Sequence, residues 1–282
     1  MNGLLTTTVG FELEGTNVTR KKVAEVVNSV IRGTINEKIS KEQEPESVKM
    51  ALDNMGVIRD ANYYEYKEHM DVDVYDIVGE KTWKVVEDFS IYPSYGMDRC
   101  FEVVTPVISE EKDLSKLWKI MRRLNKVKAL TNDSCGMHMH IGIDDPNHVK
   151  KFIMGIYENQ DYLIKKFTRN ENRLERFAKP FEGKEIDELK NKDVRCFEDI
   201  LTVFTTKEDM YDYSNKDTKH RILGLNSLVA GHVEYRASDG TVEETVAKSL
   251  FEDITYIYEE TKNNSNSTIV FPTYEEVVVY GK

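Results

Sequence analysis

The strongest structural signal in this 282-residue chain is the run Gly10-Phe11-Glu12-Leu13-Glu14-Gly15. Successive side chains of a β-strand point to opposite faces of the sheet. Phe11 and Leu13 therefore share an apolar face, which suits a protein core. Glu12 and Glu14 share the opposite face, where two carboxylates lie close together. The run predicts a strand with one buried face and one charged face.

The same alternation returns twice later in the chain. In CGMHMHIG, residues 135–142, His138 and His140 share one face and the methionines share the other. Near the end of the chain, Glu234 and Arg236 lie on either side of a tyrosine and follow a valine. Each segment predicts a strand that presents acid, imidazole or guanidinium groups from an apolar backbone.

Two further segments are compatible with this arrangement. In VVEDFS, residues 85–90, Asp88 and Ser90 would share one face of a strand. In FEVV, residues 101–104, Glu102 stands among apolar side chains. The five segments together predict a sheet whose polar face is mainly acidic and imidazole-bearing.

Each pair taken alone has an ordinary explanation, because an antiparallel sheet can leave one face in water and carry charge there. A single Glu-x-Arg pair is usually a surface ion pair of little energetic consequence. The combination favours a different interpretation, because clustered carboxylates repel one another unless cations lie between them. Magnesium prefers oxygen ligands, and manganese also accepts imidazole. The pattern therefore predicts a divalent metal site.

Composition limits the classes of partner. The formal net charge of −11 and the sequence pI near 5.2 argue against nucleic acid or an anionic membrane as the main partner. The three cysteines show no Cys-x-x-Cys spacing, which argues against a disulfide framework and a thiolate zinc site. No basic and apolar leader opens the sequence, and no apolar run approaches the roughly 20 residues of a membrane span. We expect a cytoplasmic protein.

The order of the predicted elements indicates the fold class. Strands mingle with helices without regular β–α–β alternation, which predicts an α+β fold with a mainly antiparallel sheet. We expect one domain over 1–282. The region 36–53 is strongly charged and contains Pro45, so it predicts a mobile surface excursion. We assign a variable insertion or lid to about 34–81, and residues 268–280 predict an edge strand.

Several common catalytic motifs do not occur in the sequence. There is no HExxH pair, no GxxxxGK[ST] phosphate loop and no GxSxG elbow, so zinc-protease, P-loop and serine-hydrolase chemistry lack support. Arginines instead offer bidentate contacts to phosphate or carboxylate, and the candidates are Arg169, Arg173 and Arg221. The alternative is that these arginines form solvated ion pairs, and the sequence leaves both interpretations open.

The ordered motifs resemble the amidoligase family of carboxylate–amine ligases, which has a glutamine-synthetase-like fold. The residues that carry the resemblance are 10–14, 88–90, 102–106, 135–140, 225–226, 234–236 and 240–241. Each motif is weak alone, but their order together is fairly specific. The resemblance implies a curved, mainly antiparallel sheet with helices packed on its outer face. The region 34–81 and the C-terminal tail match no motif of the family.

The resemblance also implies roles for individual residues. The implied metal ligands are Glu12, Glu14, Glu102, His138 and Glu234. Arg236 would face the transferring phosphoryl group, and His140 is either a ligand or a phosphate contact. The implied nucleotide or acidic-substrate contacts are Arg169, Arg173, Arg221, Asn226 and Ser90. Asp88 is the candidate general base. Beyond Glu102 no second acid completes the acidic set of glutamine synthetase, so the number of metal ions stays open.

The implied reaction uses ATP and Mg²⁺ or Mn²⁺. ATP phosphorylates a substrate carboxylate, and an amine attacks the acyl phosphate to give an amide or isopeptide bond. The substrates would be small-molecule or peptide carboxylates and amines. One alternative is a metal-dependent hydrolase in which His138, His140 and Glu102 activate water. Another is a non-catalytic, phage-type binding protein on the same scaffold. The sequence predicts neither the individual substrates nor the oligomeric state.

Overall fold

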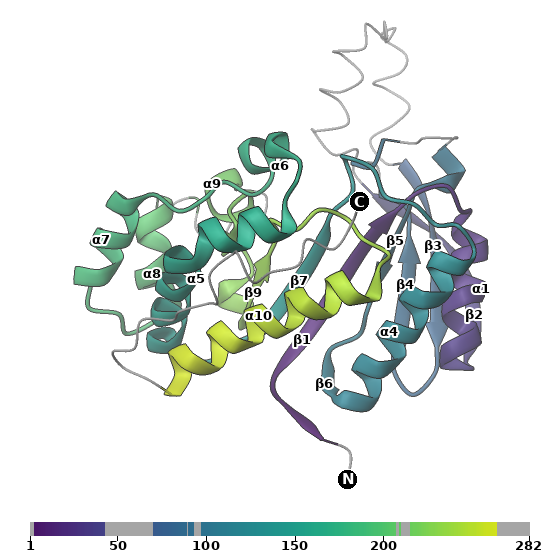
Figure 1. The fold of residues 1–282 in the computed structure, drawn as a ribbon, viewed down its shortest axis with the longest axis horizontal. Helices are drawn as coiled ribbons and strands as arrows, with labels where there is room; N and C mark the ends of the chain where they lie inside the picture. The colour runs from purple at the N-terminus through teal and green to yellow at the C-terminus, as the bar shows by residue number, and fades with distance from the viewer. Residues whose placement is uncertain are drawn as a thin grey trace, which may run out of the picture.

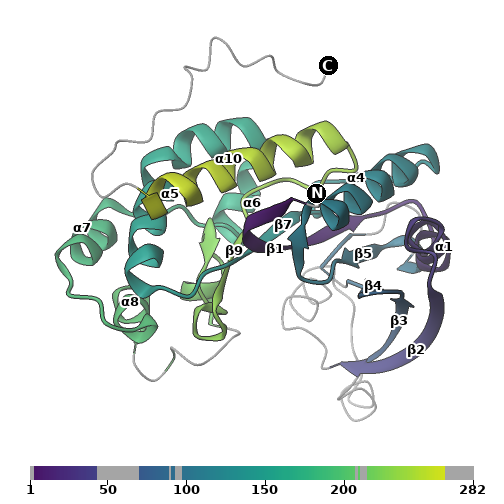
Figure 2. The same ribbon diagram turned by 90° about the horizontal axis from the view of Figure 1, so that it is seen from below.

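The fold is described from a computed structural model. The described residues are 3–42, 70–88, 90–92, 97–206, 209 and 215–263. In this part of the chain, nine strands form a single sheet whose strand pairs are antiparallel. Helices cover one face of the sheet, and the sheet curves away from them (Figures 1 and 2). The predicted α+β class with a mainly antiparallel sheet is confirmed.

The strands are β1 (Leu4–Gly15), β2 (Thr34–Glu42), β3 (Met70–Val78), β4 (Thr82–Val86), β5 (Phe101–Val104), β6 (Ile108–Glu110), β7 (Met137–Gly142), β8 (Leu223–Gly224) and β9 (His232–Tyr235). The helices of more than one turn are α1 (Arg20–Ile31), α4 (Glu111–Lys126), α5 (Pro146–Phe167), α6 (Glu171–Arg176), α7 (Gly183–Asn191), α8 (Phe197–Phe204) and α10 (Glu244–Asn263). Shorter turns are η1 (Met97–Arg99), α9 (Lys216–Lys219) and η2 (Leu228–Ala230).

The first strand lies near the middle of the sheet. The strand order is β2-β3-β4-β5-β1-β7-β9-β8, and β6 also pairs with β1. The register places Glu12 opposite Val104 on one side and His138 on the other. It also places Glu14 opposite Glu102. Segments distant in the sequence therefore bring their charged faces together around β1.

The other face of β1 is the core face. Phe11 is buried, and its ring lies 5.9 Å from that of Trp118 on α4 and 6.4 Å from that of Phe251 on α10. Leu13 is buried on the same face. Figure 2 shows α4, α5 and α10 along this side of the sheet. The apolar face predicted from the alternation is confirmed, and the helices hold the charged strands in place by covering it.

The region 34–81 differs in part from the expected surface excursion. Residues 34–42 form β2, which pairs along its whole length with β3 at the edge of the sheet. Charged side chains are common on edge strands, because they discourage pairing with another chain. Residues 43–69 and the predicted strand at 268–280 lie outside the described residues. The role of this region as an insertion or lid stays a prediction.

Within the part of the chain that the structure describes, no helix combines the length and the apolarity that crossing a bilayer requires.

Candidate metal centre

Three neighbouring strands bring one side chain each to a common point. Glu12 comes from β1, His138 from β7 and Glu234 from β9. His138 Nδ1 lies 3.1 Å from Glu12 Oε2 and 3.0 Å from Glu234 Oε1. One potential ligand atom of each residue lies within 4.8 Å of the other two. Two carboxylates and an imidazole at this spacing form a donor set for a divalent cation.

His140 and the other two predicted ligands, Glu14 and Glu102, lie around this set. His140 Nε2 lies 3.0 Å from Glu12 Oε1. Glu14 lies behind the imidazole, with Oε1 3.6 Å from His138 Nε2, and its Oε2 accepts a hydrogen bond of 2.5 Å from the Gly136 N–H. The register places Glu102 opposite Glu14 on the adjacent strand. The structure therefore brings all five predicted metal ligands, together with His140, into one region of the sheet.

Two of the carboxylates are held in the charged form. Burial raises the pKa of Glu12, but hydrogen bonds from His138 and His140 outweigh burial and hold the pKa well below its ordinary range. Burial also raises the pKa of Glu234, and the charge of Arg236 together with a hydrogen bond from His138 outweighs it in the same way. Glu12 and Glu234 are therefore anionic at neutral pH and ready to bind a cation.

The other two carboxylates show the opposite behaviour. Burial raises the pKa of Glu14 to about 7, and the charge of Asp88 adds to this effect. Burial also raises the pKa of Glu102, and the neighbouring charges of Glu12 and Asp88 raise it further. Burial is the main cause in both residues, so holding these two carboxylates in the charged form costs free energy in the metal-free protein. Such a cluster favours the binding of a divalent cation.

The burial of Glu14 leads to a stability prediction for Glu14→Gln. The pKa of Glu14 rises from 4.5 to about 7 on folding, so its carboxyl group destabilises the folded state increasingly as pH rises from about 4.5 to 7. At 1.36 kcal/mol per pH unit, this cost reaches about 3 kcal/mol above pH 7. We expect the metal-free variant to be more stable than wild type at pH 8 but not at pH 4.5.

Urea unfolding in the presence of a chelator measures this difference. Glu25→Gln, an exposed residue on α1, is the control and should give no comparable gain. A Glu14→Gln variant that is equally destabilised at both pH values would contradict the unfavourable burial of this charge.

Arg236 lies at the edge of the cluster, immediately after β9. Its Nη1 forms an ion pair with Glu234 Oε1, and the residue is 8% exposed. Its Nε has no hydrogen-bond partner among the described residues. Arg236 and Asn226 both approach Gly224. A Cβ atom at this glycine would lie 3.2 Å from Arg236 Cδ and 3.4 Å from Asn226 Oδ1. The guanidinium therefore combines a fixed position with unused hydrogen-bonding capacity.

Asp88 and Ser90 lie beyond the strand on which the sequence placed them. The strand β4 ends at Val86, and Asp88 Oδ1 accepts a hydrogen bond of 2.7 Å from the Ser90 N–H in the following turn. Their predicted position on one strand face is wrong, because this side-chain-to-backbone hydrogen bond favours a turn. Asp88 is nevertheless near the cluster, since its charge raises the pKa of Glu14 and Glu102.

Arg221 lies away from the cluster and forms a buried ion pair. Its two Nη atoms lie 2.8 and 2.7 Å from the carboxylate oxygens of Glu185 on α7. Its guanidinium carbon lies 4.8 Å from the centre of the Phe204 ring on α8. These contacts connect α7 and α8 to the residues just before β8. A role in nucleotide binding stays a prediction from sequence.

A substitution of Arg221 separates these two roles. Removing one partner of a buried ion pair leaves the other charge uncompensated, so Arg221→Ala should lower the free energy of unfolding by about 3 kcal/mol. Binding of a nonhydrolysable ATP analogue should be unchanged. Urea unfolding and calorimetric titration with this analogue in the presence of Mg²⁺ measure the two quantities. Arg195→Ala is the control, because its ion pair with Asp193 is exposed. Intact stability with weakened nucleotide binding would instead support the prediction from sequence.

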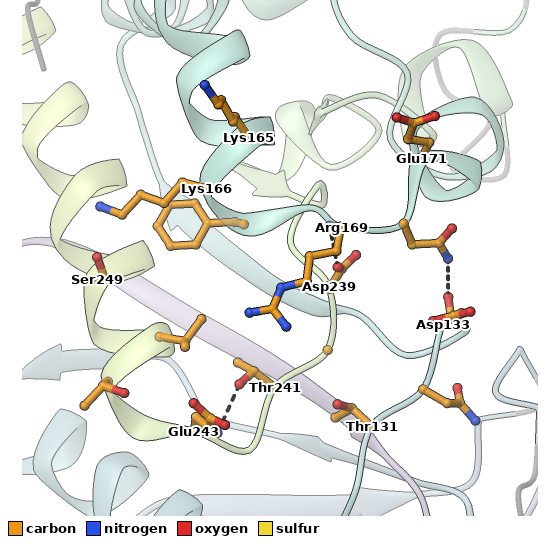
Figure 3. Close-up of a pocket in the computed structure, with 16 residues that line it drawn as sticks. Thr131, Asp133, Lys165, Lys166, Arg169, Glu171, Asp239, Thr241, Glu243 and Ser249 are labelled. Atoms are coloured by element: carbon orange, nitrogen blue, oxygen red, sulfur yellow. Dashed lines mark hydrogen bonds between the residues drawn. The ribbon is translucent and has the colours of Figure 1, made fainter. Parts of the chain in front are cut away.

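Arg169 lies in a pocket of about 800 Å³ at the end of the sheet. Loop residues 131–133, the end of α5 and the start of α10 line this pocket (Figure 3). The backbone N–H of Arg169 donates a hydrogen bond of 2.6 Å to Asp239 Oδ2. Acidic and basic side chains both line the pocket, including Asp133, Glu243 and Lys165 (Figure 3). Arg169 is therefore placed in this pocket and not in the cluster around Glu12.

Sequence reasoning did not assign His232 to the site. The rings of His232 and His140 lie 5.4 Å apart. His232 starts β9 two residues before Glu234 and therefore shares its face. The alternation of β9 includes His232, but the polar face predicted from sequence started at Glu234. The polar face is therefore one residue longer on this strand than predicted.

The protein thus combines a curved antiparallel sheet, helices on one face of it, and clustered carboxylates and histidines on the other face. The sequence profile of a family described as "Putative amidoligase enzyme" matches residues 5–252, which is most of the chain. The protein therefore belongs to this amidoligase family, as the ordered motifs predicted. No curated protein matches the sequence.

Proposed function

We propose that the protein is an ATP-dependent carboxylate–amine ligase that requires Mg²⁺ or Mn²⁺ and uses a glutamine-synthetase-like sheet. Membership of the amidoligase family supports a ligase. The observation that carries the proposal is the convergence of Glu12, His138 and Glu234 beside Arg236. Phosphoryl transfer depends mainly on positioning and on electrostatic stabilisation, and this arrangement can supply both.

The donor set fits the proposed metal. Glu12, His138 Nδ1 and Glu234 would hold the ion, with Glu14 and Glu102 next to them. Carboxylate oxygens suit Mg²⁺, and the single imidazole is well tolerated by Mn²⁺. A bound divalent ion would supply positive charge that offsets the phosphate oxygens. The anionic state of Glu12 and Glu234, described above, is the state that this binding needs.

The remaining residues have separate roles in the proposed reaction. A substrate carboxylate oxygen attacks the γ-phosphorus of ATP, and ADP leaves. Arg236 stabilises the charge on the transferring group, because its guanidinium is fixed by Glu234 and its Nε has no partner among the described residues. The amine then attacks the acyl carbon, phosphate leaves, and a base removes the amine proton. Asp88 is the proposed base.

A turnover assay tests this function. Purified protein is incubated with Mg²⁺, ATP and pools of carboxylic acids, amino acids and polyamines, and ADP is measured. We expect ADP release that depends on an acid and an amine acceptor together. Glu12→Gln is the matched inactive control. ATP that stays unchanged across wide pools would contradict the ligase proposal, and ADP release that needs no acceptor would indicate simple ATP hydrolysis.

A further inference from the structure

Arg173 contacts His138 from the side opposite Glu12 and Glu234. The residue is 4% exposed and lies on α6. Its Nη2 lies 2.9 Å from His138 Nε2. Its Nε donates to the backbone oxygen of Arg236 at 3.2 Å, and its Nη1 donates to that of Cys135 at 3.3 Å. Three contacts therefore fix the plane of the guanidinium against the edge of the imidazole.

Gly136 makes this approach possible. A Cβ atom at position 136 would lie 1.9 Å from Arg173 Nη2 and 2.8 Å from His138 Nε2. The first distance is far below any van der Waals contact, so a side chain here and the observed guanidinium position exclude each other. The glycine before the two histidines therefore provides the space through which Arg173 reaches His138.

The contact restricts the proton positions on His138. A guanidinium has only N–H donors and cannot accept a hydrogen bond, so Nε2 must be the acceptor. The proton of the neutral ring then lies on Nδ1, which faces Glu12 and Glu234. A protonated Nδ1 has no lone pair for a metal ion. The observed contact and a cation bound at Nδ1 therefore exclude each other.

Glu14 provides the alternative arrangement. A cation on Nδ1 requires the ring proton on Nε2, and that N–H needs an acceptor. Glu14 Oε1 lies 3.6 Å from His138 Nε2, and its carboxylate also attracts Arg173. The carboxylate can accept from both groups once the guanidinium moves off the ring. A protonated His138 would require the same movement, because its Nε2 also carries a proton.

We propose that Arg173 is a positioning residue that holds His138 in the tautomer unable to bind a cation, and that cation binding moves the guanidinium from His138 to Glu14. The proposal rests on the metal centre of the proposed function. It makes metal loading a switch, in which α6 and the backbone of Cys135 and Arg236 respond to the occupancy of the site.

Nitrogen-15 NMR of the histidine side chains tests the switch in the wild-type chain. The His138→Gln variant identifies the His138 signals by their loss. We expect a protonated Nδ1 and an unprotonated Nε2 in the metal-free protein, with the reverse at saturating Mg²⁺. Protonation of Nε2 before metal is added would overturn the proposal, and so would an Nδ1 that stays protonated while the metal binds. Failure to bind either Mg²⁺ or Mn²⁺ would overturn the metal centre itself, and the metal-free spectrum would still test the Arg173 contact.

A pair of variants separates the tautomer effect from the loss of charge. Arg173→Gln and Arg173→Met both remove the positive charge, but only glutamine can accept a hydrogen bond from Nε2–H. Calorimetry should show that both variants bind Mn²⁺ more tightly than wild type. The affinity of Arg173→Gln should exceed that of Arg173→Met by about two- to tenfold. Arg176→Gln, exposed on the same helix, should bind Mn²⁺ like wild type. Equal affinities of the two Arg173 variants, or weaker binding than wild type, would contradict the proposal.

Discussion

Glu12→Gln is expected to weaken Mn²⁺ binding by at least about 100-fold, because it removes the central donor of the cluster. Both carboxylate oxygens of Glu12 face imidazoles, with Oε2 near His138 and Oε1 near His140. Glutamine keeps the shape of the side chain but loses its charge, and it replaces one of these oxygens with an amide NH₂ group. Isothermal titration calorimetry of the chelator-treated protein measures the change.

The control is the same substitution elsewhere on the sheet. Glu37 lies on β2 and contacts the Tyr75 hydroxyl at 3.2 Å, so Glu37→Gln should bind Mn²⁺ like wild type. Circular dichroism spectra should show that both variants are folded. Equal affinities of wild type and Glu12→Gln would mean that any bound metal lies somewhere else.

The second large effect is expected from Arg236→Met. Loss of a fixed donor to the transferring group should lower the rate of acceptor-dependent ADP release by about 10²- to 10³-fold. Binding of Mn²⁺ should persist, because the bound ion can replace the charge of Arg236 in stabilising the Glu234 carboxylate. The measurements are ADP release at saturating substrates and Mn²⁺ titration of the same preparation.

Arg236→Lys sharpens this test. Lysine keeps the charge but not the planar, forked set of donors, so the rate should recover only in part. Full activity of Arg236→Met would exclude a role of this residue in the reaction. Parallel loss of Mn²⁺ binding and turnover would show that Arg236 acts by supporting Glu234.

The alternation of single strands could be predicted from sequence, but their pairing could not. The pattern around Glu12 indicates a strand with one charged face, because that information is local. The placement of Glu12 opposite His138 depends on a register between segments 126 residues apart. A shift of one residue would turn either side chain to the other face. The shared alternation predicted one sheet with a metal site, but neither it nor the family resemblance gave the register that places Glu12 opposite His138.

Arginine roles were the least accessible part of the site. A cationic stretch near Arg173 reads as a solvent-exposed feature, yet Arg173 is buried because Gly136 leaves space for it. Arg221 is occupied by Glu185, 36 residues away in sequence, and no spacing rule predicts that partner. The strand β2 was missed for a similar reason, since its hydrogen-bond partner β3 defines it more than its own apolar pattern does.

The proposed function requires Glu12, His138 and Glu234 to form one cation centre. Anomalous diffraction on either side of the manganese absorption edge, from crystals of the full chain grown with Mn²⁺, tests it most directly. We expect an anomalous peak within about 2.5 Å of a Glu12 carboxylate oxygen, His138 Nδ1 and a Glu234 carboxylate oxygen. Manganese bound only elsewhere, for example beside Asp133 and Asp239 in the pocket of Figure 3, would contradict it.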